Sequence, residues 1–383
     1  IIFNSYRILP EATILFYIGF MEGPILFITL NKIIIKPFEL ASKINIMFFI
    51  LLIINLAIIF FIDLPEFFVT GNPDVVSGTY GFNTYQFSML LLICGGYLLG
   101  YSYVKKYRTW FVILSQIVIF VVFFITQFRA GLPFFLLSYM VMIGFLYGKK
   151  IVYRLIPLIL VALLFIYIIL YLVGREDKLE GLKFENWVEL ISNPIKYSDY
   201  GKFKIYKNIP IMWSDNPHIF LIGTGPGNFM SRANYTFSIE MMRGDKGVAM
   251  VIKDLFGLQY PYFSDVHNKY IRHSIKSEAI FGTWQLSVPY TSYLSAIAEI
   301  GIIGGICILL MYLYLIKISI RYLGIIRKKF INFVPLSVCL IGSTTYIFGL
   351  AFLENYWEVA RVTLPVWLLF WSVKTIAYYE TES

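Results

Sequence analysis

The chain has 383 residues, of which 58% are hydrophobic, 19% aromatic and only 14% charged, and its mean hydropathy is +0.73. A soluble domain of this length has no core large enough to bury so much apolar surface, so the composition excludes a soluble globular protein. The formal net charge of +9 mostly reflects membrane topology and does not indicate a nucleic-acid binder, because such proteins cluster basic residues on one soluble face.

The predicted elements are membrane helices. A bilayer helix needs about 17–25 mostly apolar residues, and such windows recur along the chain. In order, we predict spans at residues 12–30, 45–62, 86–104, 110–127, 131–148, 151–173, 291–316, 331–353 and 362–378. Cys94, Cys307 and Cys339 all fall inside these spans, so we expect no disulfide and no thiolate metal site in the loops. The expected fold class is an all-α polytopic membrane protein.

The charges of the short loops predict the topology, since loops rich in Lys and Arg face the cytoplasm. Alternate loops are basic, and the loops between them are acidic or neutral. The basic set contains Lys32, Lys36, Lys43, Lys105, Lys106, Arg108, Lys149, Lys150, Arg154, Lys317, Arg321, Arg327, Lys328, Lys329 and Lys374. This rule places residues 175–289 and the visible N-terminus outside, so we expect one or more further spans before Ile1.

The chain therefore divides into N-terminal membrane helices (1–174), a large external loop (175–289) and C-terminal membrane helices (290–383). The loop holds all three histidines and the only glycine-dense run. Within it we predict an interfacial amphipathic helix at 178–191 and a helix break at Asn216-Pro217. Residues 223–229 (GTGPGNF) must form a turn, because three glycines and a proline within five residues exclude a regular helix.

Two features could bind an anion. The glycine turn could present backbone N–H groups to a phosphate or a pyranose oxygen; the alternative is a tight turn that packs the loop onto the membrane domain. Arg129 is a lone arginine in an external turn, TQFRAG, between two apolar helices. Its guanidinium matches the paired oxygens of a diphosphate, although arginines near helix ends also extend to lipid headgroups.

Acid–base candidates are His267, His273 and Glu299. The reference pKa of histidine, about 6.5, suits a general base, and a purely structural histidine is the alternative for each. Asp265 and His267 could begin a metal site, but the sequence offers no third and fourth ligand, so we expect no metal. Glu299 falls in the first turns of an apolar helix and must face protein, water or a substrate cavity; the alternative is that it tethers a helix end.

Three stretches together resemble a known family. They are 223–229 (GTGPGNF), 290–294 (YTSYL) and 299–304 (EIGIIG), in that order relative to the spans. The chain resembles the O-antigen polymerase/ligase superfamily, the Wzy and WaaL type of bacterial polysaccharide enzymes, best over residues 129–305. The resemblance implies a GT-C-like helical bundle in the bacterial inner membrane with its large loop on the periplasmic side. It also implies undecaprenyl-diphosphate-linked glycans as donor and acceptor, no cofactor, and a chain-length regulator as a conceivable partner.

The resemblance assigns roles to individual residues. In the family, an arginine in an external turn and a basic residue upstream of the glycine turn are associated with the donor diphosphate. Arg129 matches the first, and Lys202 or Lys204 occupies the second, where the family usually has arginine. The alternative for these lysines and Lys207 is a solvated face. Further substrate contacts are expected from Gly223, Gly225, Gly227, Arg232, Arg272, His273 and Tyr290.

The ligase branch of the family carries His-Asn where this chain has Tyr290-Thr291, and the partial match at His267-Asn268 is not followed by a membrane span. The missing histidine favours a polymerase over a ligase. We therefore expect an inverting, metal-independent polymerase of lipid-linked repeat units, with Arg129, Lys204, His267 and Glu299 as catalytic candidates. The alternatives are a ligase or another oligosaccharyltransferase, a peptidoglycan polymerase, and a transporter or flippase. A transporter usually has internal repeats and midplane charges, which this chain does not show.

Overall fold

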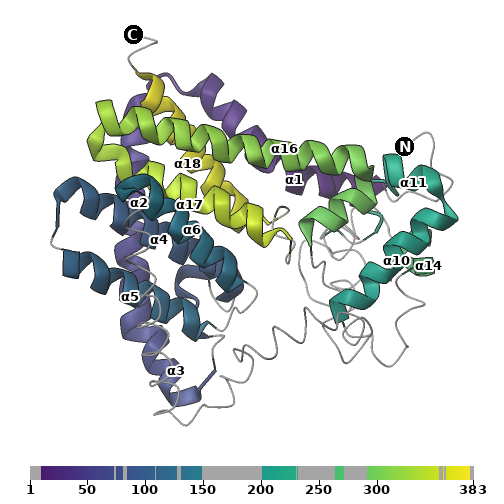
Figure 1. Cartoon of the computed structure of the whole chain (residues 1–383), viewed down its shortest axis with the longest axis horizontal. Helices are drawn as coiled ribbons and strands as arrows, with labels where there is room; N and C mark the ends of the chain where they lie inside the picture. Colours follow the sequence, from purple (N-terminus) through teal and green to yellow (C-terminus); the bar gives the residue numbers. More distant parts are fainter. Residues whose placement is uncertain are drawn as a thin grey trace. The chain divides into compact units, whose positions relative to one another are not determined.

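The computed structural model describes residues 10–72, 75–80, 84–107, 109–126, 131–148, 201–229, 231, 264–270, 291–352, 357 and 359–379. Every regular element within these ranges is a helix (Figure 1). The helices long and apolar enough to cross a membrane are Thr13–Ile33, Pro37–Thr70, Gln86–Lys105, Ser292–Lys329 and Ile331–Leu350. Shorter apolar helices cover Trp110–Ile125, Leu132–Tyr147 and Val362–Tyr378. These helices confirm the all-α membrane class, and each overlaps a predicted span, although two of them are much longer than predicted. The predicted span at 151–173 lies outside the described residues.

The chain forms two compact units that do not follow its linear order. Unit 1 contains Ile1–Glu22, Trp187–Tyr312 and Ala351–Ala360, and unit 2 contains Gly23–Asn186, Leu313–Leu350 and Arg361–Ser383. Two helices therefore contribute to both units, namely α1 (Pro10–Ile33) and α16 (Ser292–Lys329).

The core of unit 2 forms where two buried helices, α4 and α17, pack against each other. Helix α5 packs against α4, and α6 packs against both. A Cβ added to Gly100 would lie 2.5 Å from the Cα of Pro335, so glycine allows the two backbones to approach closely. Ser88 and the Tyr346 hydroxyl share a hydrogen bond of 2.7 Å across the same contact. The bounds are α4 Thr84–Lys105, α5 Thr109–Ile125, α6 Leu132–Tyr147 and α17 Val334–Leu350.

The second predicted span is longer than expected. Instead of residues 45–62, helix runs continuously through α2 (Pro37–Ile58), the π-helical turn η1 (Ile59–Asp63) and α3 (Leu64–Thr70). Proline suits the first helical position, where its missing N–H is not needed. The Lys43 ammonium donates to the Glu39 carboxylate one turn away at 2.8 Å, so charged residues that indicated a loop lie on an exposed helix face instead.

Asp63 joins this helix to the segment that follows it. Its buried carboxylate accepts the backbone N–H of Ser77 at 3.0 Å and of Gly78 at 2.8 Å. The side-chain oxygen of Asn55, which lies on α2 about two turns before Asp63, accepts the N–H of Thr79 at 3.0 Å. Short polar side chains on an apolar helix thus fix the backbone of residues 77–79, because buried N–H groups need acceptors.

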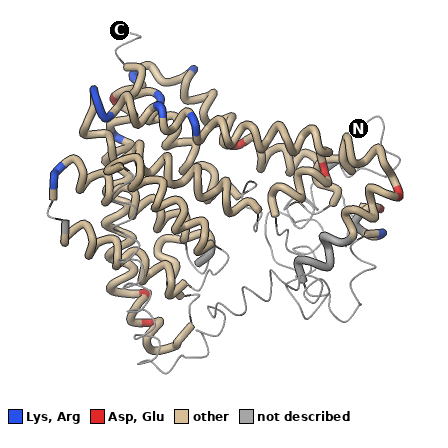
Figure 2. The backbone as a smooth tube through the Cα atoms, viewed as in Figure 1, with Lys and Arg blue, Asp and Glu red and all other residues tan. Residues whose placement is uncertain are grey.

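Many of the described basic residues of unit 2 lie near one another (Figure 2). Lys and Arg cluster around the C-terminal ends of α16 and α18 (Ala360–Tyr378) in Figure 2. Phe38, at the start of α2, packs against Phe330, Phe333 and Tyr379, with ring centroids 6.1, 5.7 and 4.0 Å away. These contacts hold the start of α2 against the ends of α16 and α18 and against the short 3-10 turn η10 (Ile331–Phe333).

Unit 1 is built from α10 (Gly201–Asp215), α11 (Pro217–Ile222), α14 (Asp265–Tyr270) and the first part of α16. The predicted break at Asn216-Pro217 is confirmed, since α10 ends and α11 begins there. The predicted amphipathic helix at 178–191 lies outside the described residues. A buried cluster joins these elements and contains Ile209, Met212, Ile219, Phe229, Val266, Tyr270 and Ala298.

Candidate functional site: a glycine turn held by a buried carboxylate

Residues 223–229 form the turn that their composition predicts. Gly223, Gly225 and Gly227 have φ values of 79°, 99° and 80°, a region that glycine adopts readily and other residues rarely do. The N–H of Gly223 donates to the carbonyl of Ile219 at 2.8 Å and closes α11. The turn begins directly at this helix end, so the buried Ile219 fixes the position of its first residue.

The turn is bonded to the backbone of α16. The N–H groups of Thr224 and Gly225 donate to the carbonyls of Ala298 and Glu299, both at 2.9 Å. In an uninterrupted helix these carbonyls would accept N–H groups four residues further along the helix. Gly301, with φ 74° and ψ 173°, breaks the helical path between them. The break therefore leaves the two carbonyls available to the turn.

Glycine is required at the crossing of the two segments. A Cβ at Gly223 would lie 2.2 Å from the carbonyl oxygen of Glu299, and a Cβ at Gly301 would lie 2.0 Å from the carbonyl oxygen of Leu221. Both distances are far below van der Waals contact, and the atoms met belong to the backbone, which cannot turn aside. The two glycine-containing motifs thus form one interlocked contact.

The Glu299 side chain completes this contact. It is 0% exposed, and its Oε2 accepts the N–H of Gly227 at 2.5 Å. Its Oε1 accepts the N–H groups of Phe229 at 3.0 Å and Ser231 at 2.7 Å. Bonds from N–H groups to a carboxylate are strong and offset the free energy of burying it. The anion that the N–H groups of this turn hold is therefore the carboxylate of the protein itself.

Residues that sequence reasoning missed support the outer side of the turn. The Thr13 hydroxyl of α1 donates to the carbonyl of Pro226 at 2.8 Å, and the Ser264 hydroxyl donates to the carbonyl of Asn228. Thr13, Asn228 and Ser264 are all buried. Only the position of Asn228 inside the glycine motif marked any of them, because the other two lie in stretches that carry no pattern.

A second polar contact links α10 to α14. The Tyr270 hydroxyl donates to Oδ2 of Asp215 at 2.8 Å, and the Lys269 ammonium lies 3.1 Å from the same oxygen. Asn216 donates to the Tyr270 hydroxyl at 3.0 Å. The hydrogen bond from Tyr270, and then that from Lys269, lower the pKa of the Asp215 carboxyl from its ordinary value. This contact sets the end of α14 beside the end of α10.

The predicted site residues fall into three groups. Gly223, Gly225, Gly227 and Glu299 meet in the contact described above. Lys202 and Lys204 lie on α10 and His267 on α14, in the same unit. The remaining predicted site residues lie outside the described part of the chain; they are Arg129, Arg232, Arg272, His273 and Tyr290. No group of three or more His, Cys, Asp or Glu side chains suited to a metal ion occurs among the residues that the structure describes.

The hydrogen bonds of Glu299 bear on two predicted roles, that of Glu299 as a base and that of the glycine turn as an anion-binding site. Both oxygens of Glu299 accept backbone N–H groups, which favours a tether of the helix end over a proton acceptor. Three N–H groups of the turn region, at Gly227, Phe229 and Ser231, donate to this side chain. Contact between the turn and a substrate stays a prediction.

Comparison of the chain with protein-family models, with curated proteins and with solved structures finds no match.

Proposed function

We propose that this multi-pass membrane protein is a glycosyltransferase that polymerises undecaprenyl-diphosphate-linked repeat units into O-antigen, capsule or exopolysaccharide. The observation that carries the proposal is the contact between the turn and Glu299. The GTGPGNF and EIGIIG stretches are two of the three on which the resemblance to the polymerase/ligase superfamily rests. Their direct contact supports a shared role, because the two stretches, about 70 residues apart, form one structural element.

The proposed reaction is an inverting displacement. A hydroxyl oxygen on the end sugar of one lipid-linked glycan attacks the anomeric carbon of a second. The new C–O bond forms as the bond from that carbon to the lipid diphosphate breaks, and the diphosphate leaves with the bonding electron pair. The hydroxyl proton passes to a base or to water. Lipid-linked donor and acceptor are large, so holding them in reactive geometry supplies much of the rate enhancement.

Cations stabilise the charge that develops on the leaving diphosphate. We assign this role to Arg129 and Lys204, with Arg232 and Arg272, both in the loop, as further candidates. His267 and His273 are the candidates for the base. The part of Glu299 in this proposal is structural: its carboxylate fixes the turn on the first part of α16. The large loop lies on the periplasmic side of the inner membrane.

A mutant in polysaccharide-producing cells tests the proposal. Arg129→Ala should abolish polymer while the protein level and the single-repeat lipid stay as in the wild type, because only the transfer step is lost. Arg327→Ala is a matched control, since this arginine lies at the basic end of α16 and donates to the carbonyl of Phe145 at 3.0 Å. Polymer of unchanged chain length in Arg129→Ala would contradict the assignment, and His267→Ala with unchanged polymer would remove that residue as the base.

The acceptor separates the polymerase from the related enzymes. Purified protein supplied with lipid-linked glycan should extend that glycan itself. Transfer to a lipid A core would identify a ligase, and transfer to a protein would identify an oligosaccharyltransferase. Movement of the lipid across the bilayer without any new glycosidic bond would identify a transporter or flippase.

A further inference from the structure

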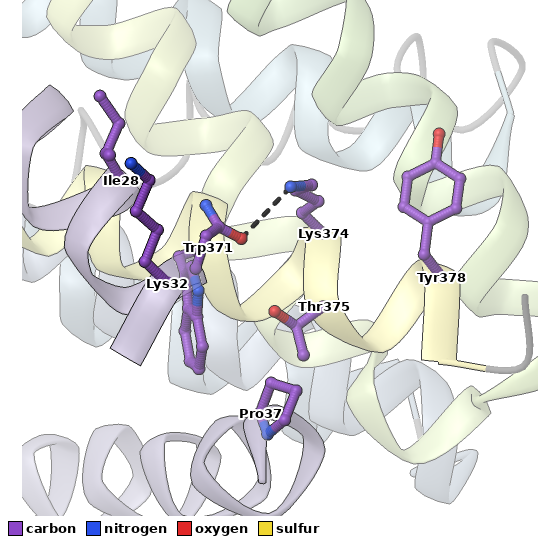
Figure 3. A pocket seen from close by; sticks show the side chains of 8 residues that line it. Ile28, Lys32, Pro37, Trp371, Lys374, Thr375 and Tyr378 are labelled. Carbon is purple, nitrogen blue, oxygen red and sulfur yellow. Dashed lines mark hydrogen bonds between the residues drawn. The ribbon is translucent and has the colours of Figure 1, made fainter. Parts of the chain in front are cut away.

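A cavity of about 380 Å³ lies in unit 2, between the end of α1, the start of α2 and the end of α18. Its volume is within the range of small-molecule sites, about 300–1,000 Å³. Figure 3 shows Lys32 of α1 and Lys374 of α18 extending to the same side of this cavity. The fully buried ring of Trp371 closes one wall. None of the residues that line the cavity is among those assigned to glycosyl transfer.

The polar groups of the cavity suit an anion. Lys32 and Lys374 bring two ammonium groups, and Thr375 adds a hydroxyl. The ion pairs among the described residues are Lys36–Glu39, Lys43–Glu39 and Lys269–Asp215, so neither cavity lysine is neutralised by a described carboxylate. Lys374 donates to Oδ1 of Asn31 at 3.3 Å, as the dashed line in Figure 3 shows. This bond positions the ammonium without cancelling its charge.

Lys374 is also held by an aromatic ring. Its Nζ lies 5.1 Å from the centroid of Phe27, within the range of a cation–π contact. Together with the bond to Asn31, this contact places the ammonium from two directions. A lysine restrained in this way loses less side-chain entropy when it binds an anion than a free surface lysine does.

The position of the cavity favours a lipid over a soluble anion. It lies where α1 ends and α2 begins, and both are long and apolar enough to cross a membrane. The ends of such helices lie at the level of the lipid headgroups. Ile28, which lines the cavity, is 51% exposed, and Ile25, one turn earlier on α1, is 55% exposed. An acyl chain could lie along these side chains while the phosphate above it contacts the lysines.

We propose that this cavity binds the phosphate of an anionic phospholipid, with Lys32 and Lys374 as its cationic ligands and Ile28 beside the glycerol and acyl chain. The site is independent of the proposed glycosyl transfer. Basic pockets between membrane helices are a recurring form of anionic lipid recognition. The bound phosphate would contact the ends of α1, α2 and α18 and would offset the positive charges of Lys32 and Lys374.

Lipid titration of the purified full chain in detergent tests the proposal, with native mass spectrometry to count bound lipid. Phosphatidylglycerol should bind with a defined apparent Kd. Lys32→Gln and Lys374→Gln should each weaken it about fivefold, and the double variant about thirtyfold, since a lysine near an anionic headgroup contributes about that factor. The control is Lys43→Gln, which removes the same charge from the same end of unit 2 but pairs with Glu39 outside the cavity; its Kd should stay unchanged.

Several results would overturn the proposal. The double variant could bind phosphatidylglycerol as tightly as the wild type, or Lys43→Gln could weaken it equally, which would indicate general surface charge. Inorganic phosphate that displaces the lipid from the wild type but not from the double variant would assign the cavity to a soluble anion. Equal affinity for phosphatidylethanolamine would show that the net charge of the lipid is not recognised. The far-UV circular dichroism and the Tm of each variant without lipid should match the wild type, because Lys32 is exposed and Lys374 is half-buried.

Discussion

Replacing Glu299 by alanine removes the acceptor of three buried backbone N–H groups, those of Gly227, Phe229 and Ser231. A buried donor left without a partner costs about 1–3 kcal/mol. Water that enters the vacated space will satisfy some of the three donors, so we expect a loss of about 3–5 kcal/mol in the free energy that holds the turn on α16. Glu299→Gln should lower this free energy less than Glu299→Ala does, because the amide oxygen still accepts N–H groups. Some loss should remain, because the amide NH₂ group then faces a backbone N–H that it cannot accept.

Hydrogen–deuterium exchange reads this loss locally. A loss of about 3–5 kcal/mol corresponds to roughly 10²–10⁴-fold faster exchange of amides in residues 223–231, since about 1.4 kcal/mol is a factor of ten. Mass spectrometry of peptides from the detergent-solubilised protein measures it. Glu66→Ala is the control, because this glutamate is exposed on α3 in the other unit. Exchange in Glu299→Ala as slow as in the wild type would refute the tethering role.

Gly301→Ala should lower the free energy of unfolding by about 3 kcal/mol or more, because φ is positive and the new Cβ meets backbone atoms. The control is Gly324→Ala, at a helical position with open space around it, which should raise the free energy of unfolding by up to about 1 kcal/mol. Asp215→Asn should have a lower Tm than the wild type above the ordinary carboxyl pKa of 3.8. That difference should vanish as the pH falls through the lowered pKa of the folded protein, because a depressed carboxyl pKa stabilises only the ionised state. Lys204→Ala should reduce polymer yield roughly 10²-fold, while Lys207→Ala on the same helix leaves it unchanged; equal losses would indicate a general charge effect.

The helices of this protein could be predicted because a membrane span depends on composition over about 20 residues. Their ends could not. α16 continues to Lys329 because Lys317 and Arg321 are exposed while Tyr322 and Ile326 are buried, so beyond the apolar stretch it continues as a two-faced helix. The expected end at residue 316 followed from the first charge, which marks where apolar character stops and not where helix stops.

The site was predictable only in part, for a different reason. Three glycines and a proline identified the turn, and an acidic residue in an apolar helix identified Glu299 as a residue that needs a partner. That these two features are partners depends on contacts between residues about 70 positions apart, which no local pattern encodes. The break at Gly301 illustrates this: its sequence context is that of an ordinary apolar helix, and the positive φ of 74° together with the approach of Leu221 explains why glycine is needed there.

Reconstitution of the purified protein with a single species of lipid-linked repeat unit tests the central claim most directly. The products are lipid-linked glycans whose lengths can be read by gel or mass spectrometry. The account predicts a ladder of two, three and more repeat units, with one lipid diphosphate released for each bond formed and with no nucleotide sugar added. Repeat units that remain single, with no lipid diphosphate released, would contradict it.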